Sequence, residues 1–319
     1  MVASRLGRRI VVTGGAGFIG THTVRQLLAS DYEVLVVDDL RHGCGEEVPA
    51  PANLLVANMA GTEAHDAIVA FRPWALIHLA AQGGVNRSLM DPAADATNNV
   101  AGTAAVLRAM VDAGCMRIVF ASSGGAIYGR ARRLPSEEHD RAQPLAPYGA
   151  AKLAGEGYLG MFRRTFGVRF TAMRYGNVYG PYQDGTGEAG LVAITCQRLL
   201  QGLAPVVTGD GEQTRDFVYV ADVARANVLA LATPIDGPIN IGTGKPTSVN
   251  AIVDTLRSLV NHAPAPERTA ARPGEVRSNF LNVTRARTRL GWYAEVDLTD
   301  GLSRTLTAFS DRESTATHR

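Results

Sequence analysis

Cysteine is scarce in this sequence. The three cysteines, Cys44, Cys115 and Cys196, are odd in number and are not spaced like metal ligands. A disulfide framework and a metal centre are therefore not expected, and reduced thiols in a cytoplasmic protein are. The first nine residues carry three arginines but lack the apolar stretch of a secretory signal, which agrees with that location.

An excess of charge of one sign is also missing. Lys and Arg total 32 and Asp and Glu total 30, so the formal net charge is +2. This balance argues against a chain built to coat nucleic acid or an anionic membrane surface, although it leaves room for local positive clusters. No apolar run approaches the roughly 18 residues of a membrane-spanning helix. With 319 residues, of which 46% are hydrophobic, the chain is long enough for about two domains with a large core.

Glycine, in contrast, is abundant. The sequence has 34 glycines, whereas the average frequency of about 7% would give roughly 22. Many of them separate short aliphatic runs, whose unbroken apolar character is typical of strands buried on both faces of a parallel sheet. The expected strands are Arg9–Thr13, Glu33–Val37, Asn53–Ala57, Ala75–Leu79, Met116–Ala121 and Val168–Met173. The expected helices between them include Phe18–Ser30, Thr62–Phe71 and Asp91–Ala113.

Alternating strands and helices predict an α/β fold with a doubly wound parallel Rossmann sheet. The alternation fades after about Gly180, and loops rich in Gly and Asp follow. We therefore expect a Rossmann domain over 1–180 and a smaller C-terminal α/β domain over 181–310. The chain is expected to cross back to the sheet near 217–242, and the polar residues 311–319 to form a flexible tail.

A glycine-rich turn joins the first expected strand to the first expected helix. Gly14, Gly17 and Gly20 are three residues apart, and Gly15, Gly17 and Gly20 fit the dinucleotide fingerprint. Such a turn lets a pyrophosphate approach the backbone at a helix N-terminus. Asp38 follows Gly20 by 18 residues, where a carboxylate binds the adenosine ribose and favours NAD over NADP. The alternative is a turn beside an unrelated surface acid.

Several further motifs, in order, make the sequence resemble the extended short-chain dehydrogenase/reductases, and among them the NAD-dependent sugar-nucleotide epimerase/dehydratase group. The resemblance runs from Ile10 to about Leu302. The segments that carry it are Thr13–Gly20, His78–Gln82, Asn98–Val100, Ser122–Gly129, Tyr148–Lys152, Arg174–Pro181, Gly209–Val220 and Arg272–Glu275. It implies NAD as cofactor, contacted by Gly14, Gly17, Phe18, Ile19, Gly20, Asp38, Asn58, Met59, Leu79, Ala80, Ala81, Gln82, Asn99, Tyr148, Lys152 and Tyr175.

Tyr148 and Lys152 stand four residues apart at the start of an expected helix, and hence on one face. A phenol with a pKa near 10 is a weak base at neutral pH, and a neighbouring ammonium is expected to lower that pKa. By resemblance, Tyr148 takes the proton of a sugar hydroxyl and Lys152 also holds the nicotinamide ribose. The alternative is an ordinary surface pair, since this spacing is common.

The usual Ser or Thr of the family is replaced by Gly124, and we expect Ser123, one residue earlier, to supply the hydroxyl. The alternative is that Ser123 only caps a strand end. Related dehydratases and decarboxylases carry an acid just before the loop tyrosine, Tyr128, where this chain has Gly125 and Ala126. The resemblance therefore implies epimerisation rather than elimination or decarboxylation.

The predicted function is NAD-dependent 4-epimerisation of a UDP-hexose, of the glucose/galactose type. Alternatives are 4-epimerisation of UDP-glucuronate or a UDP-N-acetylhexosamine, another sugar-nucleotide dehydratase or reductase, and a non-catalytic NAD sensor. By resemblance, the substrate contacts are Ser123, Gly124, Arg87, Tyr148, Asn177, Arg215, Arg272 and Glu275. The resemblance also implies a homodimer that pairs through helices, with 100–111 and 151–162 as candidates.

Overall fold

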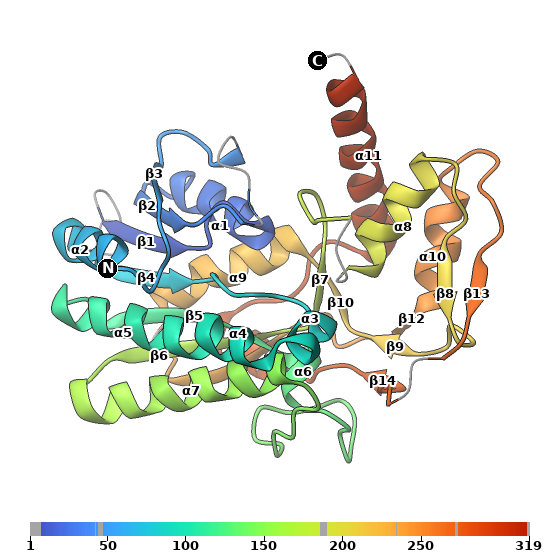
Figure 1. Cartoon of the computed structure of the whole chain (residues 1–319). Coiled ribbons are helices and arrows are strands. Elements are labelled where there is room, and N and C mark those ends of the chain that lie inside the picture. Colours follow the sequence, from blue (N-terminus) through green and yellow to red (C-terminus); the bar gives the residue numbers. More distant parts are fainter. Residues whose placement is uncertain are drawn as a thin grey trace.

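The computed structural model describes residues 8–41, 43, 47–185, 190–233, 235–271 and 274–317. Its centre is a seven-stranded sheet in the order β11-β6-β5-β4-β1-β2-β3, parallel throughout (Figure 1). The strands are β1 (Arg9–Thr13), β2 (Glu33–Asp38), β3 (Asn53–Val56), β4 (Ala75–His78), β5 (Arg117–Ser123), β6 (Arg169–Tyr175) and β11 (Gly237–Ile241). The doubly wound parallel sheet predicted from the sequence is confirmed.

Helices cover both faces of this sheet. Helices α1 (Phe18–Leu28) and α9 (Val220–Ala232) pack together on one face, and α2 (Thr62–Phe71), α5 (Gly102–Asp112) and α7 (Pro147–Phe166) lie on the other. Successive strand residues enter opposite cores: Val12 belongs to the core under α1 and α9, and Val11 to the core under α2, α5 and α7. Burial on both faces explains why these strands read as unbroken apolar runs.

The long helix expected over Asp91–Ala113 is three segments. Helix α4 (Pro92–Ala96) begins at Asp91, whose side chain accepts a hydrogen bond from the Ala94 N–H at 2.9 Å. A π-helical turn, η2 (Thr97–Ala101), then precedes α5. The short helix α3 (Val85–Met90) comes before them. A π-turn widens the helix locally and often marks a functional site.

The C-terminal half builds a smaller unit with its own core, on the right of Figure 1. Its helices are α8 (Leu191–Leu200), α10 (Val249–Ser258) and α11 (Leu298–Thr317), and η3 (Ala286–Leu290) is a π-turn beside α9. Three small sheets complete the fold: β7 (Asn177–Tyr179) with β10 (Phe217–Tyr219), β9 (Thr214–Arg215) with β12 (Thr247–Ser248) and β14 (Ser278–Asn279), and β8 (Val206–Thr208) with β13 (Glu267–Thr269). The chain returns to the main sheet through α9 and β11.

Helix α11 continues past the point where a flexible tail is predicted. The helix includes residues 311–317, and the Ser314 hydroxyl donates to the Ser310 carbonyl at 3.0 Å. The predicted tail is therefore helical as far as Thr317, because no glycine or proline interrupts this stretch. Within the described ranges, no helix is both long and apolar enough to cross a bilayer.

Candidate active site

The carboxyl ends of β1, β2 and β4 meet around the glycine-rich turn. Gly14 has φ +71°, and a Cβ on it would lie 2.5 Å from the Ala80 nitrogen. A Cβ on Gly20 would lie 2.1 Å from the Gly14 carbonyl oxygen. Both positions therefore require glycine. Gly17 is the N-cap of α1 and offers no side-chain cap, so the first N–H groups of the helix are available to an anion.

Asp38 ends β2 beside this turn. One carboxylate oxygen accepts the Ala16 N–H at 3.0 Å, and the other accepts the Leu40 N–H at 2.9 Å. The carboxylate is thus held by the backbone and keeps lone pairs for a ribose hydroxyl. Asn58, just after β3, is exposed, and its amide oxygen accepts the Ala60 N–H at 2.8 Å. The neighbouring Met59 packs into the α2–α5–α7 core.

The loop after β4 is fixed by a buried amide. The N–H groups of Leu79 and Ala80 both donate to the Thr13 carbonyl at 3.0 Å. Asn99 accepts the Gln82 N–H at 2.8 Å and returns a hydrogen bond to the Gln82 carbonyl at 3.0 Å. These two hydrogen bonds place the segment 79–82, with Ala81 inside it, against the π-turn. These residues lie where the sequence predicts cofactor contacts.

Three side chains predicted to be catalytic come together at the end of β5. Ser123 is the last residue of that strand, and Tyr148 and Lys152 lie one turn apart on α7. The Lys152 ammonium lies 5.8 Å from the centroid of the Tyr148 ring and 5.1 Å from that of Phe120. Only 4% of Lys152 is exposed. The amine and the phenol therefore share a sheltered site beside the cofactor-binding loops.

Burial governs the titration of this pair. Burial, and after it the Asp95 charge, raise the pKa of Tyr148 to about 12, although a hydrogen bond from the Ser123 hydroxyl acts in the opposite direction. Burial lowers the pKa of Lys152 to about 8, against the opposing charge of Asp95. The predicted lowering of the Tyr148 pKa is not seen in this structure, because desolvation of the phenol and the Asp95 charge together raise that pKa.

The geometry explains why the family hydroxyl is absent at Gly124. A Cβ on Gly124 would lie 2.8 Å from both terminal methyl carbons of Leu281 and 3.2 Å from the Arg174 carbonyl oxygen. A side chain there would point into the core rather than toward the cleft. Gly125 is different, since a Cβ on it would lie 3.5 Å from the Asn177 amide oxygen and 3.8 Å from the Ser123 hydroxyl. Ser123 and Asn177 therefore border one small space.

The predicted substrate-binding residues are only partly brought together. Arg215 pairs with Glu275 at 3.3 Å, so the two side chains lie next to each other. Asn177 is exposed on β7 next to the Ser123 loop. Arg87 is exposed on α3. Arg272 lies outside the described residues.

Tyr175, predicted as a cofactor contact, is buried under α9. Its hydroxyl donates to the Asn227 amide oxygen at 2.7 Å, so the phenol is used inside the core. Sequence reasoning missed two buried titratable groups nearby. His78 bridges the hydroxyls of Thr13 at 2.6 Å and Thr103 at 3.1 Å. Asp95 lies under the catalytic helix, and its spacing of four from Asn99 is a signal that could have found it.

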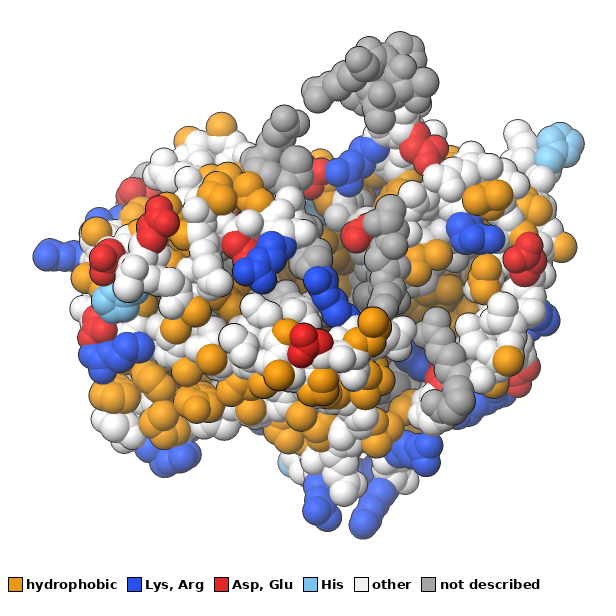
Figure 2. Space-filling model, viewed as in Figure 1, with side chains coloured by type: hydrophobic (Ala, Val, Ile, Leu, Met, Phe, Trp, Pro, Cys, Tyr) orange, Lys and Arg blue, Asp and Glu red, His pale blue; other side chains and the backbone are white. Residues whose placement is uncertain are grey.

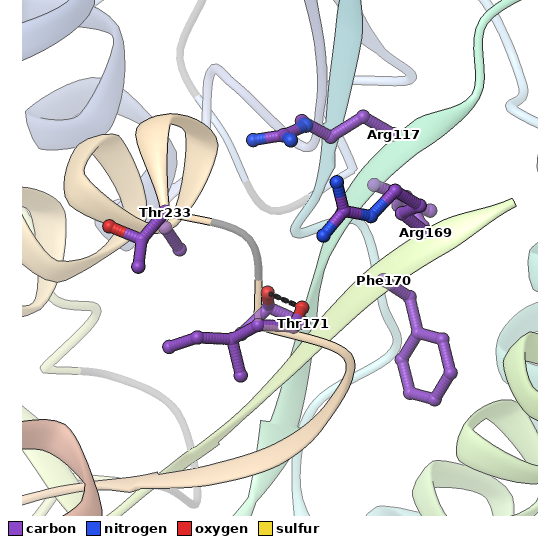
Figure 3. Close-up of a pocket in the computed structure, with 8 residues that line it drawn as sticks. Arg117, Arg169, Phe170, Thr171 and Thr233 are labelled. Carbon is purple, nitrogen blue, oxygen red and sulfur yellow. Dashed lines mark hydrogen bonds between the residues drawn. The ribbon is translucent and has the colours of Figure 1, made fainter. Parts of the chain in front are cut away.

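A separate small pocket lies at the amino ends of the strands, at the end of the sheet opposite to the glycine-rich turn (Figure 3). It is lined by Arg117, Arg169 and Thr171 at the amino ends of β5 and β6, and the Thr171 hydroxyl donates to the Ile235 carbonyl there. Its free volume is about 10 Å³, about enough for one water molecule. Ligands of open parallel sheets bind at the carboxyl ends of the strands. The cluster around Ser123, Tyr148 and Lys152 is therefore the candidate active site.

The chain is similar to known proteins over nearly its whole length. The chain matches the NAD dependent epimerase/dehydratase family over residues 10–242. The UDP-glucose 4-epimerase of Mycolicibacterium smegmatis is 39% identical over 310 residues, covering 95% of this chain and 99% of the relative. A Thermotoga maritima UDP-glucose 4-epimerase crystallised with UDP-glucose has a TM-score of 0.93 and 41% identity, covering 96% and 99% of the two chains. The UDP-glucose 4-epimerase of Thermus thermophilus, in complex with NAD, has a TM-score of 0.90 and 38% identity, covering 95% and 99%.

Proposed function

The chain belongs to the NAD dependent epimerase/dehydratase family, and from this premise we propose that it interconverts UDP-glucose and UDP-galactose by inverting C4 of the hexose. The family resemblance inferred from the sequence is confirmed. Relatives at 39% and 41% identity that cover nearly the whole chain are UDP-glucose 4-epimerases. The observation that carries the proposal is the convergence of Ser123, Tyr148 and Lys152 beside the glycine-rich turn.

The cofactor is NAD, as in the family. The residues fit it: Gly14 and Gly20 leave no room for side chains where the backbone meets the pyrophosphate, and Asp38 presents a fixed carboxylate to the ribose. When bound, the nicotinamide cofactor would supply the hydride acceptor and donor that inversion at C4 requires. Asn99 and Gln82 would hold the loop that faces the cofactor.

In this mechanism Tyr148 takes the proton of the C4 hydroxyl during oxidation and gives it back after the ring has turned over. The Ser123 hydroxyl donates a hydrogen bond to the Tyr148 phenol oxygen and stabilises the phenolate. Lys152 contributes a positive charge one helical turn away. No acid stands at Gly125 or Ala126 to move a carbon-bound proton. Inversion therefore requires only these three groups and the cofactor.

The diphosphate of the substrate would bind between the two units. Arg215 carries a planar guanidinium suited to two phosphate oxygens, and its partner Glu275 would be free to meet the nucleoside once the arginine turns to the phosphates. Asn177 lies beside Ser123 and would anchor the sugar end of the diphosphate. In this proposal residues 1–180 supply the cofactor contacts together with Asn177, and residues 181–310 contribute Arg215 and Glu275 to substrate binding.

The test is incubation of the purified protein with UDP-galactose and no added cofactor. UDP-glucose should form, because NAD is regenerated in each cycle, and Tyr148→Phe should keep NAD bound while losing turnover by at least about 10³-fold. Product formation by Tyr148→Phe near the wild-type rate would refute the assigned role. Absence of any sugar-nucleotide binding by the wild type would instead favour a non-catalytic NAD sensor.

We also propose a homodimer formed through α5 and α7. Hydrophobic side chains gather over the outer surface of α7 (Figure 2), where Tyr158 and Phe166 are 38% and 36% exposed. Large exposed apolar side chains on one helix are typical of an interface. Light scattering should give twice the 33.8 kDa mass of one chain. The Tyr158→Glu variant should give the mass of the monomer. A cytoplasmic location is proposed with it, since the buried thiols of Cys115 and Cys196 are unpaired.

A further inference from the structure

A buried carboxylate lies under the catalytic helix. Asp95 is on α4, only 1% exposed, and both α4 and the following π-turn pack against α7. One of its oxygens accepts the Asn99 amide at 2.9 Å, and the other has no hydrogen-bond partner among the residues that the structure describes. A buried carboxylate with an unsatisfied oxygen destabilises the fold unless a charge compensates for it. A compensating positive charge is therefore expected near Asp95.

The charged groups around Lys152 leave Asp95 as its counter-charge. On α7, Glu156 is paired with Arg174 of β6 at 2.7 Å. On α5, Asp112 is paired with Arg108 at the exposed end of the helix.

The other titratable groups near Lys152 are neutral or remote from it. His78 of β4 is held neutral, because burial lowers its pKa to about 3. Tyr148 and Tyr175 are neutral phenols whose pKa values are raised by burial. Arg87 on α3 is exposed. Within the described ranges, no carboxylate lies close enough to Lys152 to form a salt bridge, for which the limit is 4.0 Å. Asp95 is the acid whose charge raises the pKa of Lys152.

We propose that Asp95 is a positioning residue that keeps Lys152 in its ammonium form and, through Asn99, holds the Gln82 loop against the active site. This inference rests on the proposed epimerase function for its catalytic meaning. Asp95 touches neither the sugar nor the reacting atoms in this proposal. It acts through its charge on Lys152 and through its hydrogen bond to the Asn99 amide, which orients the oxygen of that amide toward the Gln82 N–H.

The charge has consequences of known sign. The carboxylate raises the pKa of Lys152 and also raises that of Tyr148. Asp95→Asn removes the charge but keeps an oxygen that can accept from Asn99, so the hydrogen bond survives. The pKa values of both Lys152 and Tyr148 then fall. Since activity needs a charged Lys152 and a deprotonated Tyr148, both limbs of the pH–rate profile move to lower pH, by on the order of one unit.

Lysine is rare enough here for a direct measurement. Of the 32 basic residues, only Lys152 and Lys245 are lysines. Protein labelled with ¹³C at the lysine ε-carbon therefore gives two NMR signals, assigned with Lys245→Arg. The NAD-loaded wild type and Asp95→Asn are titrated between pH 6 and 11, roughly spanning the amine. The Lys152 signal should titrate about one unit lower in the variant, and the Lys245 signal should not move.

Asp91→Asn is the matched control. Asp91 caps the same helix, but its side chain is exposed, and asparagine also caps helices. The variant therefore removes the same negative charge from a position where solvent screens it, and the pKa of Lys152 should not change. Asp95→Ser provides a second neutral variant if Asp95→Asn does not fold. An unchanged Lys152 titration in a folded, neutral variant would overturn the proposal. The NMR result does not depend on turnover, so absence of epimerase activity in the wild type would refute the proposed function separately.

Discussion

Replacement of Ser123 by alanine tests the least conventional part of the site. The hydroxyl that the family resemblance implies at position 124 is missing, and Ser123 is the group whose hydrogen bond lowers the pKa of Tyr148. The serine ends β5 in extended backbone with φ −140° and ψ 107°, a conformation that alanine adopts equally well. Loss of the hydroxyl should therefore change chemistry and leave the fold intact, at a cost below about 1 kcal/mol in stability.

The expected loss follows from what the hydroxyl stabilises. A donor aimed at a developing oxyanion contributes about 2–4 kcal/mol, which corresponds to a decrease in kcat of about 30-fold to 10³-fold. KM should change little, because the interaction strengthens only as Tyr148 loses its proton. The acid limb of the pH–rate profile should also move to higher pH, since removal of the donor raises the Tyr148 pKa. This direction is opposite to that expected for Asp95→Asn.

The assay is conversion of UDP-galactose to UDP-glucose over a series of pH values on either side of the Lys152 pKa of about 8. Ser123→Thr is the conservative control and should retain most activity. In the double variant Ser123→Ala/Gly124→Ser the hydroxyl stands at the family position, but its Cβ would press on Leu281 at 2.8 Å, so activity should not return and the melting temperature should fall. Activity of Ser123→Ala within about threefold of wild type, or rescue by Gly124→Ser, would refute the reasoning.

Two further predictions concern substrate binding and acid stability. Arg215→Met should raise the KM for UDP-galactose about 10- to 100-fold with little change in kcat, because it removes a charge-assisted phosphate contact worth about 1.5–3 kcal/mol. The control is Arg277→Met, which removes an exposed arginine paired with Asp210. An equal effect of both variants on KM would contradict a specific role for Arg215. Burial lowers the pKa of His78 from 6.5 to about 3, so the unfolded state binds a proton that the folded state does not in this range. The free energy of unfolding should therefore fall by about 1.4 kcal/mol per pH unit from this group as pH drops below about 6. Urea titrations should show a shallower decline for His78→Gln, which can still hydrogen-bond to both threonines, and an equal slope would argue against the buried neutral imidazole.

The sequence was sufficient to predict features that depend only on backbone conformation or on a few neighbouring residues. Gly14 and Gly20 are readable because no other residue tolerates a left-handed turn or a close approach of this kind. The strands are readable because burial on both faces demands unbroken apolar runs, as in β1, where Val11 and Val12 enter different cores. The pairing of Tyr148 with Lys152 is likewise contained in a spacing of four on one helix.

Charge balance and side-chain direction were decided only by the tertiary structure. No local sequence pattern reveals that a side chain at position 124 would meet Leu281. Nor does one reveal that Arg215 and Glu275, 60 residues apart, form an ion pair. The sign of the Tyr148 shift depends on how much solvent the surrounding helices exclude, and Asp95 gains its influence only because α4 packs against α7. Glycine turns and helix spacing are properties of a few neighbouring residues, whereas desolvation and electrostatic coupling are sums over everything that folding brings near.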